Sequence, residues 1–353
     1  MEILDRSQRL RKVTYTTSNG VVIIDGDVTY GTEEEFAKAV DAAKRTNPGF
    51  ASDRQRRALS WTPGTNARPG AEVLYAYENA TAEASAGEVM KRGIEAWKAK
   101  APFLKFTKQP FSKKGTPGVL VITTEECGGC SAPVGYHNES MPMIMQSGCP
   151  GRSEACAVSE AIHELGHSLG KSMFSKRLQV SLFFAGLFHE HQRPDRKEFV
   201  DFLCQNVDPV CNTMPAGKTC CDYEDDAVPL ECCEMMTFFE DMDVGPETYM
   251  DAEGSYDLLS VMHYRADASA QDGKITLVSK NPQIPIPLLG RDQPSEGDVA
   301  RLCKRYPKEC APERSSNNTS KGAVVQTSGI SLTPVSLSFA YLCLPLLTTL
   351  LMI

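Results

Sequence analysis

Residues 163–170 read H-E-L-G-H-S-L-G, and a related run, L-F-H-E, follows at residues 187–190. Two histidines four positions apart lie on one face of a helix, about one turn from each other, so His163 and His167 can bind the same zinc ion. Glu164 lies beside the first of them, where it can accept a proton from a water molecule bound to the metal. We predict that His189, in the second run, is the third zinc ligand.

A second motif lies farther along the chain, where residues 260–264 read S-V-M-H-Y. In metzincins a methionine turn of this kind underlies the metal and follows the histidine motif. Taken alone, Met262 would be typical of an ordinary core residue, and the histidine motif would be compatible with a polar surface helix. The two motifs in this order favour a metal site over both alternatives.

The details of these motifs resemble one family of metzincins. Residues 188–196, F-H-E-H-Q-R-P-D-R, and the S-V-M-H-Y turn are similar to those of the astacin metalloendopeptidases, and residues 205–209, Q-N-V-D-P, resemble the stretch that follows in that family. The resemblance covers roughly residues 61–310. It implies one zinc ion per subunit, bound by the three histidines, with Glu164 as the general base that activates water for hydrolysis of internal peptide bonds in a protein or peptide substrate.

The resemblance also implies roles for three residues around the metal. Tyr264 is expected to be a fifth ligand that moves away to hydrogen-bond the tetrahedral intermediate, and stabilisation of this kind is commonly a large catalytic term. Met262 is expected to form a hydrophobic floor. Glu190 is expected to anchor the mature N-terminus.

The chain departs from the family between Gly170 and His189. Eighteen residues stand where the family has two, so sixteen are extra, conveniently residues 171–186. Lengthening a loop ninefold costs only roughly 2 kcal/mol in additional closure entropy, whereas structural zinc sites contribute about 10 to 16 kcal/mol. However, residues 170–172 can be encoded with a splice donor and residues 183–186 with a splice acceptor. We therefore favour a retained short intron or a gene-model error over a genuine inserted loop.

This interruption leaves a second functional class open. If residues 171–186 displace His189, the protein would be a non-catalytic surface or adhesion protein on the same fold. Glu164 and Tyr264 are both present, which favours catalysis.

Composition indicates a secreted protein. The net charge is -8, which provides no basic stripe for nucleic acid, and the 13 cysteines are typical of a disulfide framework in an oxidising compartment. The resemblance pairs Cys130 with Cys149, which leaves Cys127 and Cys156 for an additional bridge.

Residues 204–233 form a cysteine-rich insertion whose six cysteines allow fifteen connectivities. We favour disulfides there over a second zinc site. Phe103 occupies the position of a cysteine in the family, so Cys310 is expected to pair with Cys303 instead.

Residues 1–57 resemble a propeptide that precedes a catalytic domain over residues 58–310. Residues 24–28, I-D-G-D-V, resemble the astacin pro-segment motif whose aspartate occupies the zinc, so Asp27 is expected to be a latency switch. The alternative is an Asp-Gly turn in a simple hairpin. Residues 54–57, R-Q-R-R, predict cleavage by a processing protease after Arg57, although a solvated basic run is the commoner meaning of such a sequence.

Cleavage after Arg57 would leave only three residues before Trp61, where astacins have a longer arm. Three residues span about 10 Å at most. Either the cut lies upstream, or this enzyme lacks the contact between its new terminus and Glu190.

The resemblance implies an α+β zincin (metzincin) fold, with two lobes around a cleft, a mixed sheet, an active-site helix and the methionine turn, and the hydrophobic periodicity agrees with it. An extended peptide could then lie along the edge of the upper sheet. The expected strands cover residues 73–78, 103–108, 119–124 and 142–146, and the expected helices cover residues 83–100, 154–169 and 295–304.

Both ends of the chain bear on its location. Residues 1–20 lack the apolar core of a signal peptide, so we expect a missing start or unconventional export. A polar linker, residues 311–334, precedes an apolar tail, residues 335–353, in the order of a GPI-anchor signal, with a membrane-spanning helix as the alternative. We therefore expect a secreted or surface-anchored glycoprotein that contacts the membrane through this tail. Sequons lie at Asn79, Asn138, Asn317 and Asn318.

Overall fold

The computed structural model describes most of the region that carries the motifs. The described residues are 2–4, 10–12, 15–24, 26–45, 68–137, 139–148, 155–169, 187–209, 214, 216–222, 233 and 254–311. Several predicted features lie outside them: the insertion 171–186, the basic run 54–57, the linker beyond residue 311, the tail 335–353 and much of the cysteine-rich segment. Within the described residues, none of the helices is both long and apolar enough to cross a membrane.

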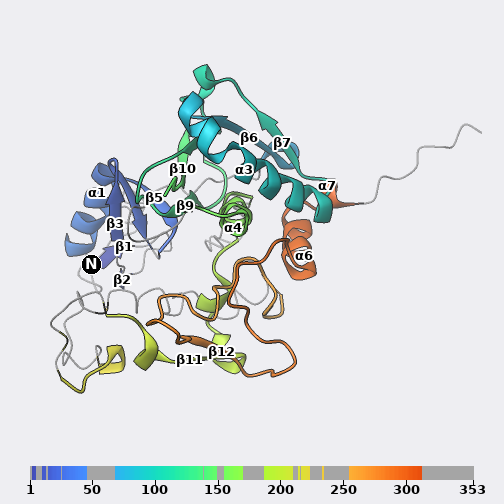
Figure 1. Cartoon of the computed structure of the whole chain (residues 1–353). Coiled ribbons are helices and arrows are strands. Elements are labelled where there is room, and N and C mark those ends of the chain that lie inside the picture. Colours follow the sequence, from blue (N-terminus) through green and yellow to red (C-terminus); the bar gives the residue numbers. More distant parts are fainter. Residues whose placement is uncertain are drawn as a thin grey trace, which may run out of the picture. The chain divides into compact units, whose positions relative to one another are not determined.

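The central element is an eight-stranded sheet with the order β3-β4-β5-β9-β10-β8-β6-β7 (Figure 1). In that order its strands are β3 (Tyr15–Ser18), β4 (Val21–Ile24), β5 (Val28–Thr32), β9 (Cys130–Pro133), β10 (Met141–Met145), β8 (Leu120–Thr123), β6 (Glu72–Tyr77) and β7 (Lys105–Lys108). Strand β10 pairs parallel with β8 and antiparallel with β9, so the sheet is mixed. The predicted α+β class is confirmed.

Two long helices pack together beside the sheet. Helix α3 (Ala80–Lys100) begins three residues earlier than predicted, because the side chain of Asn79 caps it by accepting a hydrogen bond from the Ala82 backbone at 2.9 Å. Helix α4 (Val158–Ser168) carries the histidine motif. The indole of Trp97 on α3 donates to the carbonyl oxygen of Ile162 on α4, and both side chains are buried.

The C-terminal part of the described chain is a second layer below α4. Strands β11 (Val200–Phe202) and β12 (Leu277–Ser279) form a small antiparallel sheet with its own buried cluster. The predicted final helix is α6 (Glu296–Arg305), which Ser295 caps, and it is followed by the short α7 (Pro307–Cys310).

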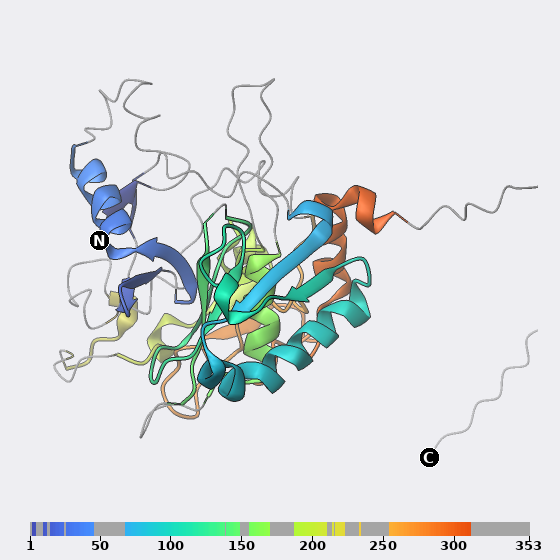
Figure 2. The same cartoon turned by 90° about the horizontal axis from the view of Figure 1, so that it is seen from above.

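The N-terminal segment extends the same sheet. Strands β3, β4 and β5 form an antiparallel meander, and β5 pairs parallel with β9, which lies in the region of the predicted catalytic domain. Figure 2 shows these N-terminal strands (blue) continuing the sheet. Helix α1 (Glu33–Arg45) covers them, and Phe36 and Val40 on this helix belong to a buried cluster that also includes Val134. The described N-terminus also contains a short hairpin, β1 (Glu2–Leu4) with β2 (Leu10–Lys12).

The disulfides correct part of the predicted pairing. Cys130 is bonded to Cys156, with 6.0 Å between their Cα atoms, so the expected pairs Cys130–Cys149 and Cys127–Cys156 are wrong. The reason is the register of the sheet: the Gln146 backbone donates to the Gly129 carbonyl oxygen and accepts from the Cys156 backbone, which brings Cys156 beside Cys130. Cys127 is also disulfide-bonded.

Other disulfides agree with the sequence. Cys303 pairs with Cys310, as expected. In the cysteine-rich segment Cys204 bonds Cys221, and Cys220 bonds Cys233, so these four residues are not ligands of a second zinc.

Candidate active site

Three histidines from two segments converge beneath β9. His163 and His167 project from successive turns of α4, and His189 lies just before the short helix η3 (Glu190–Gln192). Their ring centroids are 4.8 to 5.2 Å apart, and the Nε2 atoms of His163 and His189 are separated by 3.2 Å. The interruption in the sequence therefore does not keep His189 away from the other two.

The outer nitrogen of each imidazole is held by a hydrogen bond. His163 Nδ1 donates to the carbonyl oxygen of Val261 at 2.7 Å, and His167 Nδ1 donates to that of Leu187 at 2.7 Å. His189 Nδ1 bonds the Gln192 side-chain oxygen at 2.9 Å. Because each Nδ1 carries the proton, each Nε2 directs its lone pair toward the common centre, as in metal-ligating histidines.

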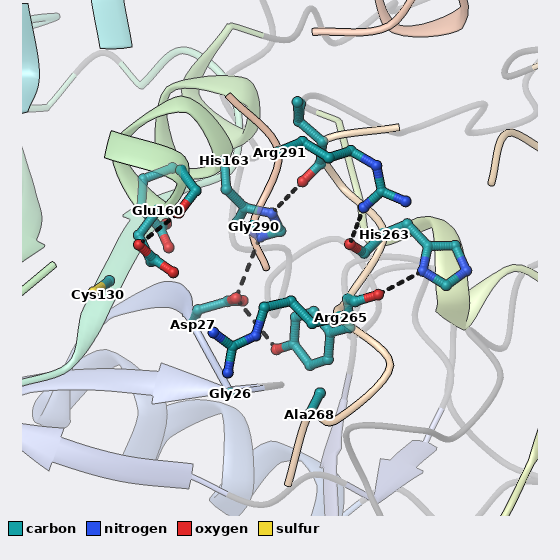
Figure 3. A pocket seen from close by; sticks show the side chains of 14 residues that line it. Gly26, Asp27, Cys130, Glu160, His163, His263, Arg265, Ala268, Gly290 and Arg291 are labelled. Atoms are coloured by element: carbon teal, nitrogen blue, oxygen red, sulfur yellow. Dashed lines mark hydrogen bonds and ion pairs between the residues drawn. The ribbon is translucent and has the colours of Figure 1, made fainter. Parts of the chain in front are cut away.

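Asp27 lies at this centre, at the turn between β4 and β5 (Figure 3). Its carboxylate oxygens are 3.3 Å from His163 Nε2, 3.6 Å from His167 Nε2 and 2.9 Å from His189 Nε2. Burial raises the pKa of Asp27, but the charge of His189 and the contacts with the three imidazoles outweigh it and hold the pKa well below its usual range. The hydroxyl of Tyr264 also donates to Asp27, at 3.2 Å.

The donor set fits a zinc ion. The four side chains offer ligand atoms that all lie within 4.8 Å of one another. His167 Nε2 and Asp27 Oδ1 are buried, and neither has a hydrogen-bond partner among the described residues. Burial lowers the pKa of His167 to about 4, which keeps the imidazole neutral, the form that binds metals. Three imidazole nitrogens and one carboxylate oxygen are ordinary ligands of tetrahedral zinc.

Glu164 lies next to these histidines on α4 and is only 1% exposed. Burial, followed by the charges of Asp27 and Glu160, raises its pKa well above the ordinary value for a carboxyl. Its Oε2 atom has no hydrogen-bond partner among the described residues. A carboxylate whose pKa is raised is a stronger base than an ordinary carboxylate, which suits a group that accepts a proton.

Met262 packs against α4 directly behind the histidines. It is fully buried, and a Cβ atom added to Gly166 would lie 2.5 Å from its sulfur. The turn that contains Met262 is fixed from α6, because Asp298 accepts hydrogen bonds from the Ser260 hydroxyl and the Val261 backbone. The glycine inside the histidine motif is therefore required by the close approach of the methionine.

Glu190 is also buried, and its carboxylate contacts two arginines and a backbone nitrogen. Its Oε1 atom lies 2.7 Å from Nη2 of Arg301 and 2.6 Å from the Asp257 backbone nitrogen, and Arg193 Nη1 is 3.4 Å away. Burial raises the pKa of Glu190 to about 7, against the lowering effect of the two arginines. Its role as an anchor for a mature N-terminus stays a prediction, since these contacts belong to the uncleaved chain.

Sequence analysis missed Arg301 as a partner of this site. A signal for it exists, because the buried residues of α6 follow a helical spacing and Arg301 lies on that face: Asp298, Arg301, Leu302 and Arg305. A charged residue on the buried face of a helix is unusual without a partner.

An open cavity of about 290 Å³ lies on one side of the histidine site (Figure 3). His163, Glu164 and Tyr264 line it, together with Asp27 and Cys130 at the start of β9. The cavity thus combines two of the candidate metal ligands, His163 and Asp27, with a buried carboxyl and a hydroxyl donor beside a strand to which a peptide could pair.

Comparison with known proteins finds similarity to the same family as the motifs. Residues 233–307 match the family model described as Astacin, a peptidase family. Zinc metalloproteinase nas-5 of Caenorhabditis elegans is 24% identical over 54% of this chain and 41% of that protein. Zinc metalloproteinase nas-8 of Steinernema carpocapsae is 26% identical over 50% of this chain and 31% of that protein. The chain thus covers less than half the length of these relatives.

A solved structure is also similar. High choriolytic enzyme 1, a hatching enzyme zinc-protease from Oryzias latipes, is 18% identical and matches 70% of this chain and 96% of its own, with a TM-score of 0.45.

Proposed function

We propose that this chain, a member of the astacin family of zinc metalloproteinases, is a zinc-dependent endopeptidase that is made in a latent form. The observation that carries the proposal is the convergence of three Nδ1-fixed histidines on one point, with Glu164 beside them. His163, His167 and His189 would hold one zinc ion per subunit. The substrate would be a protein or peptide.

The residues around the centre supply the remaining chemistry. Zinc supplies a Lewis acid and lowers the pKa of a water molecule in the site. Glu164, whose pKa burial raises, would accept a proton from that water and pass it to the leaving amine. Tyr264 would donate its hydroxyl hydrogen to the carbonyl oxygen of the scissile bond, where negative charge develops in the transition state.

Latency is supported by two contacts of the N-terminal segment. Strand β5 pairs with β9, with Val28 opposite Ala132, and so occupies an edge to which an extended substrate would otherwise add a strand. Asp27 contacts the three histidines and accepts a hydrogen bond from the hydroxyl of Tyr264. Removal of residues 1–57 by a processing protease at Arg57 would remove both the strand pairing and the Asp27 contacts.

The proposed location is extracellular. The disulfides form in oxidising compartments. Attachment to a membrane would depend on the tail, residues 335–353.

A protease assay tests the proposal. The full chain and a form without residues 171–186 are assayed on a quenched protein substrate, before and after cleavage near Arg57, with a zinc chelator and with zinc restored. We expect cleavage to raise hydrolysis, the chelator to abolish it, and the Glu164→Ala variant to lack it. Zinc binding without chelator-sensitive hydrolysis in either form would overturn the proposal and favour the non-catalytic surface protein.

A further inference from the structure

The segment that carries His189 is fixed from behind by a buried ion pair. Glu190 directly follows His189, and its backbone nitrogen donates to the carbonyl oxygen of Met262 at 2.9 Å. Its side chain lies 2.7 Å from Arg301. The exposed fractions of the two residues are 1% and 3%, so this pair is screened very little by solvent.

One guanidinium thereby joins three separate parts of the chain. Arg301 belongs to α6, and its Nη2 atom donates both to Glu190 and to the carbonyl oxygen of Ser255, the latter at 3.3 Å. Its Nη1 atom lies 3.5 Å from the hydroxyl oxygen of Ser260, at the start of the methionine turn. The planar, five-donor guanidinium suits such a position, whereas an ammonium group presents a point charge.

Arg193 is the other cation near Glu190, but its strongest bonds lead elsewhere. Its Nε and Nη2 atoms each lie 2.8 Å from an oxygen of Asp195, and Nη2 also donates to the carbonyl oxygen of Gly254 at 2.9 Å. Its separation from Glu190 is 3.4 Å, against 2.7 Å for Arg301. Arg301 is therefore the main partner of the Glu190 carboxylate.

We propose that Arg301 is a positioning residue for the third zinc ligand and acts through Glu190. A buried carboxylate that loses its cation is strongly destabilised where it stands, so it moves toward other donors or toward solvent. Such a movement of Glu190 displaces the backbone that carries His189. The inference rests on the proposed function, since it concerns the geometry of the same zinc centre. Because Arg301 is part of the chain before cleavage, this support for His189 does not depend on a new N-terminus.

The test measures the metal site itself in the full chain. Zinc affinity is determined by competition with a chelator, and the cobalt-substituted protein is examined by visible absorption, for Arg301→Met and Arg301→Lys. The control is Arg305→Met, which removes another arginine from the buried face of the same helix, one whose Nη1 atom donates to the Arg301 carbonyl oxygen at 3.3 Å, and leaves the Arg301 guanidinium in place. We expect Arg301→Met to weaken zinc binding about 10- to 100-fold and to alter the cobalt spectrum, as loss of a residue that orients a ligand does. Arg301→Lys should recover part of the loss, and Arg305→Met should change neither readout.

A second set of variants keeps the test decisive if Arg301→Met does not fold. Glu190→Gln removes the buried charge, so the double variant Glu190→Gln with Arg301→Met leaves no carboxylate unpaired. We expect the double variant to lose no more zinc affinity than the worse single variant, because both act on one interaction. Wild-type affinity and spectrum in Arg301→Met, equal loss in Arg305→Met, or additive losses in the double variant would overturn the inference. Failure of the wild-type chain to bind zinc would instead overturn the proposed function.

Discussion

Asp27 and Glu190 are two carboxylates next to the same three histidines, but they contact different residues. Asp27 contacts the imidazoles from the cleft, and it belongs to an N-terminal strand meander with its own apolar cluster. Glu190 lies behind them, in the segment that provides His189, and it is bonded to Arg301. Under the proposed cleavage after Arg57, Asp27 would leave with its segment and Glu190 would stay. The proposed control of access and the proposed support of the metal site would then belong to separate parts of the chain.

The largest effect is expected for Glu164, where a substitution should reduce turnover without reducing metal binding. In the cleaved enzyme Glu164→Gln should lower kcat/KM by about 10²- to 10⁴-fold, because it removes the general base. The zinc content should stay at one ion per chain, since the histidine hydrogen bonds do not involve Glu164. Steady-state kinetics and metal analysis check both. Loss of zinc in this variant would contradict the claim that Glu164 acts in turnover and not in metal binding.

The next effect concerns the disulfide at the cleft edge. The Cys130–Cys156 bond spans 26 residues and ties β9 to the segment before α4, so replacing both cysteines by serine should lower the free energy of unfolding by about 3 to 4 kcal/mol. Replacing Cys303 and Cys310, which are 7 residues apart, should cost about 2 to 3 kcal/mol. Denaturant unfolding gives both values. Only the first pair should also weaken latency, because Cys130 lies in β9, which pairs with β5, whereas Cys303 and Cys310 lie in α6 and α7. An equal effect on latency would refute this assignment.

The third effect tests Asp27 directly. In the uncleaved chain Asp27→Ala should raise hydrolysis about 10- to 100-fold, because the charged hydrogen bond from Tyr264 to Asp27, a type of bond that contributes about 1.5 to 3 kcal/mol, no longer holds the segment over the histidines. Asp27→Asn, which keeps the size of the side chain, should have a smaller effect. The initial rate of the intact protein is the measurement. Unchanged latency in Asp27→Ala would mean that strand pairing alone closes the cleft.

The smallest effect concerns the rear of the site. Gly166→Ala places a methyl group 2.5 Å from the sulfur of Met262 and 3.3 Å from the Trp97 ring, so it should lower stability by about 1 to 3 kcal/mol. Gly115→Ala is the control, since nothing lies within 4 Å of its added Cβ, and it should change stability by less than about 0.5 kcal/mol. If Gly166→Ala lowers stability no more than the control does, the Met262 side chain can move to accommodate the methyl group, and the close approach does not require glycine.

The sequence predicted those parts of the fold that depend on local patterns. The helices expected over residues 83–100 and 295–304 follow from the spacing of neighbouring residues and are present as α3 and α6. The histidine motif together with the methionine turn identified the candidate metal ligands. The pairing of Cys130 with Cys156 depends on the register between β9 and β10, which no local pattern encodes. The same is true of the bond between Glu190 and Arg301, which lie 111 residues apart in the sequence.

The parallel pairing of β5 with β9 has a consequence for solubility. While the N-terminal meander is in place, β9 has a neighbour on each side, and Val134 is fully buried beside the meander. Removal of the meander would leave β9 as an edge strand with unpaired backbone groups, which is a template for association with other chains. Cleavage would therefore convert β9 from a paired strand into an exposed edge strand that can pair with another chain. The cleaved protein should form light-scattering aggregates at concentrations at which the intact chain stays dispersed, and a bound substrate-like peptide should prevent this.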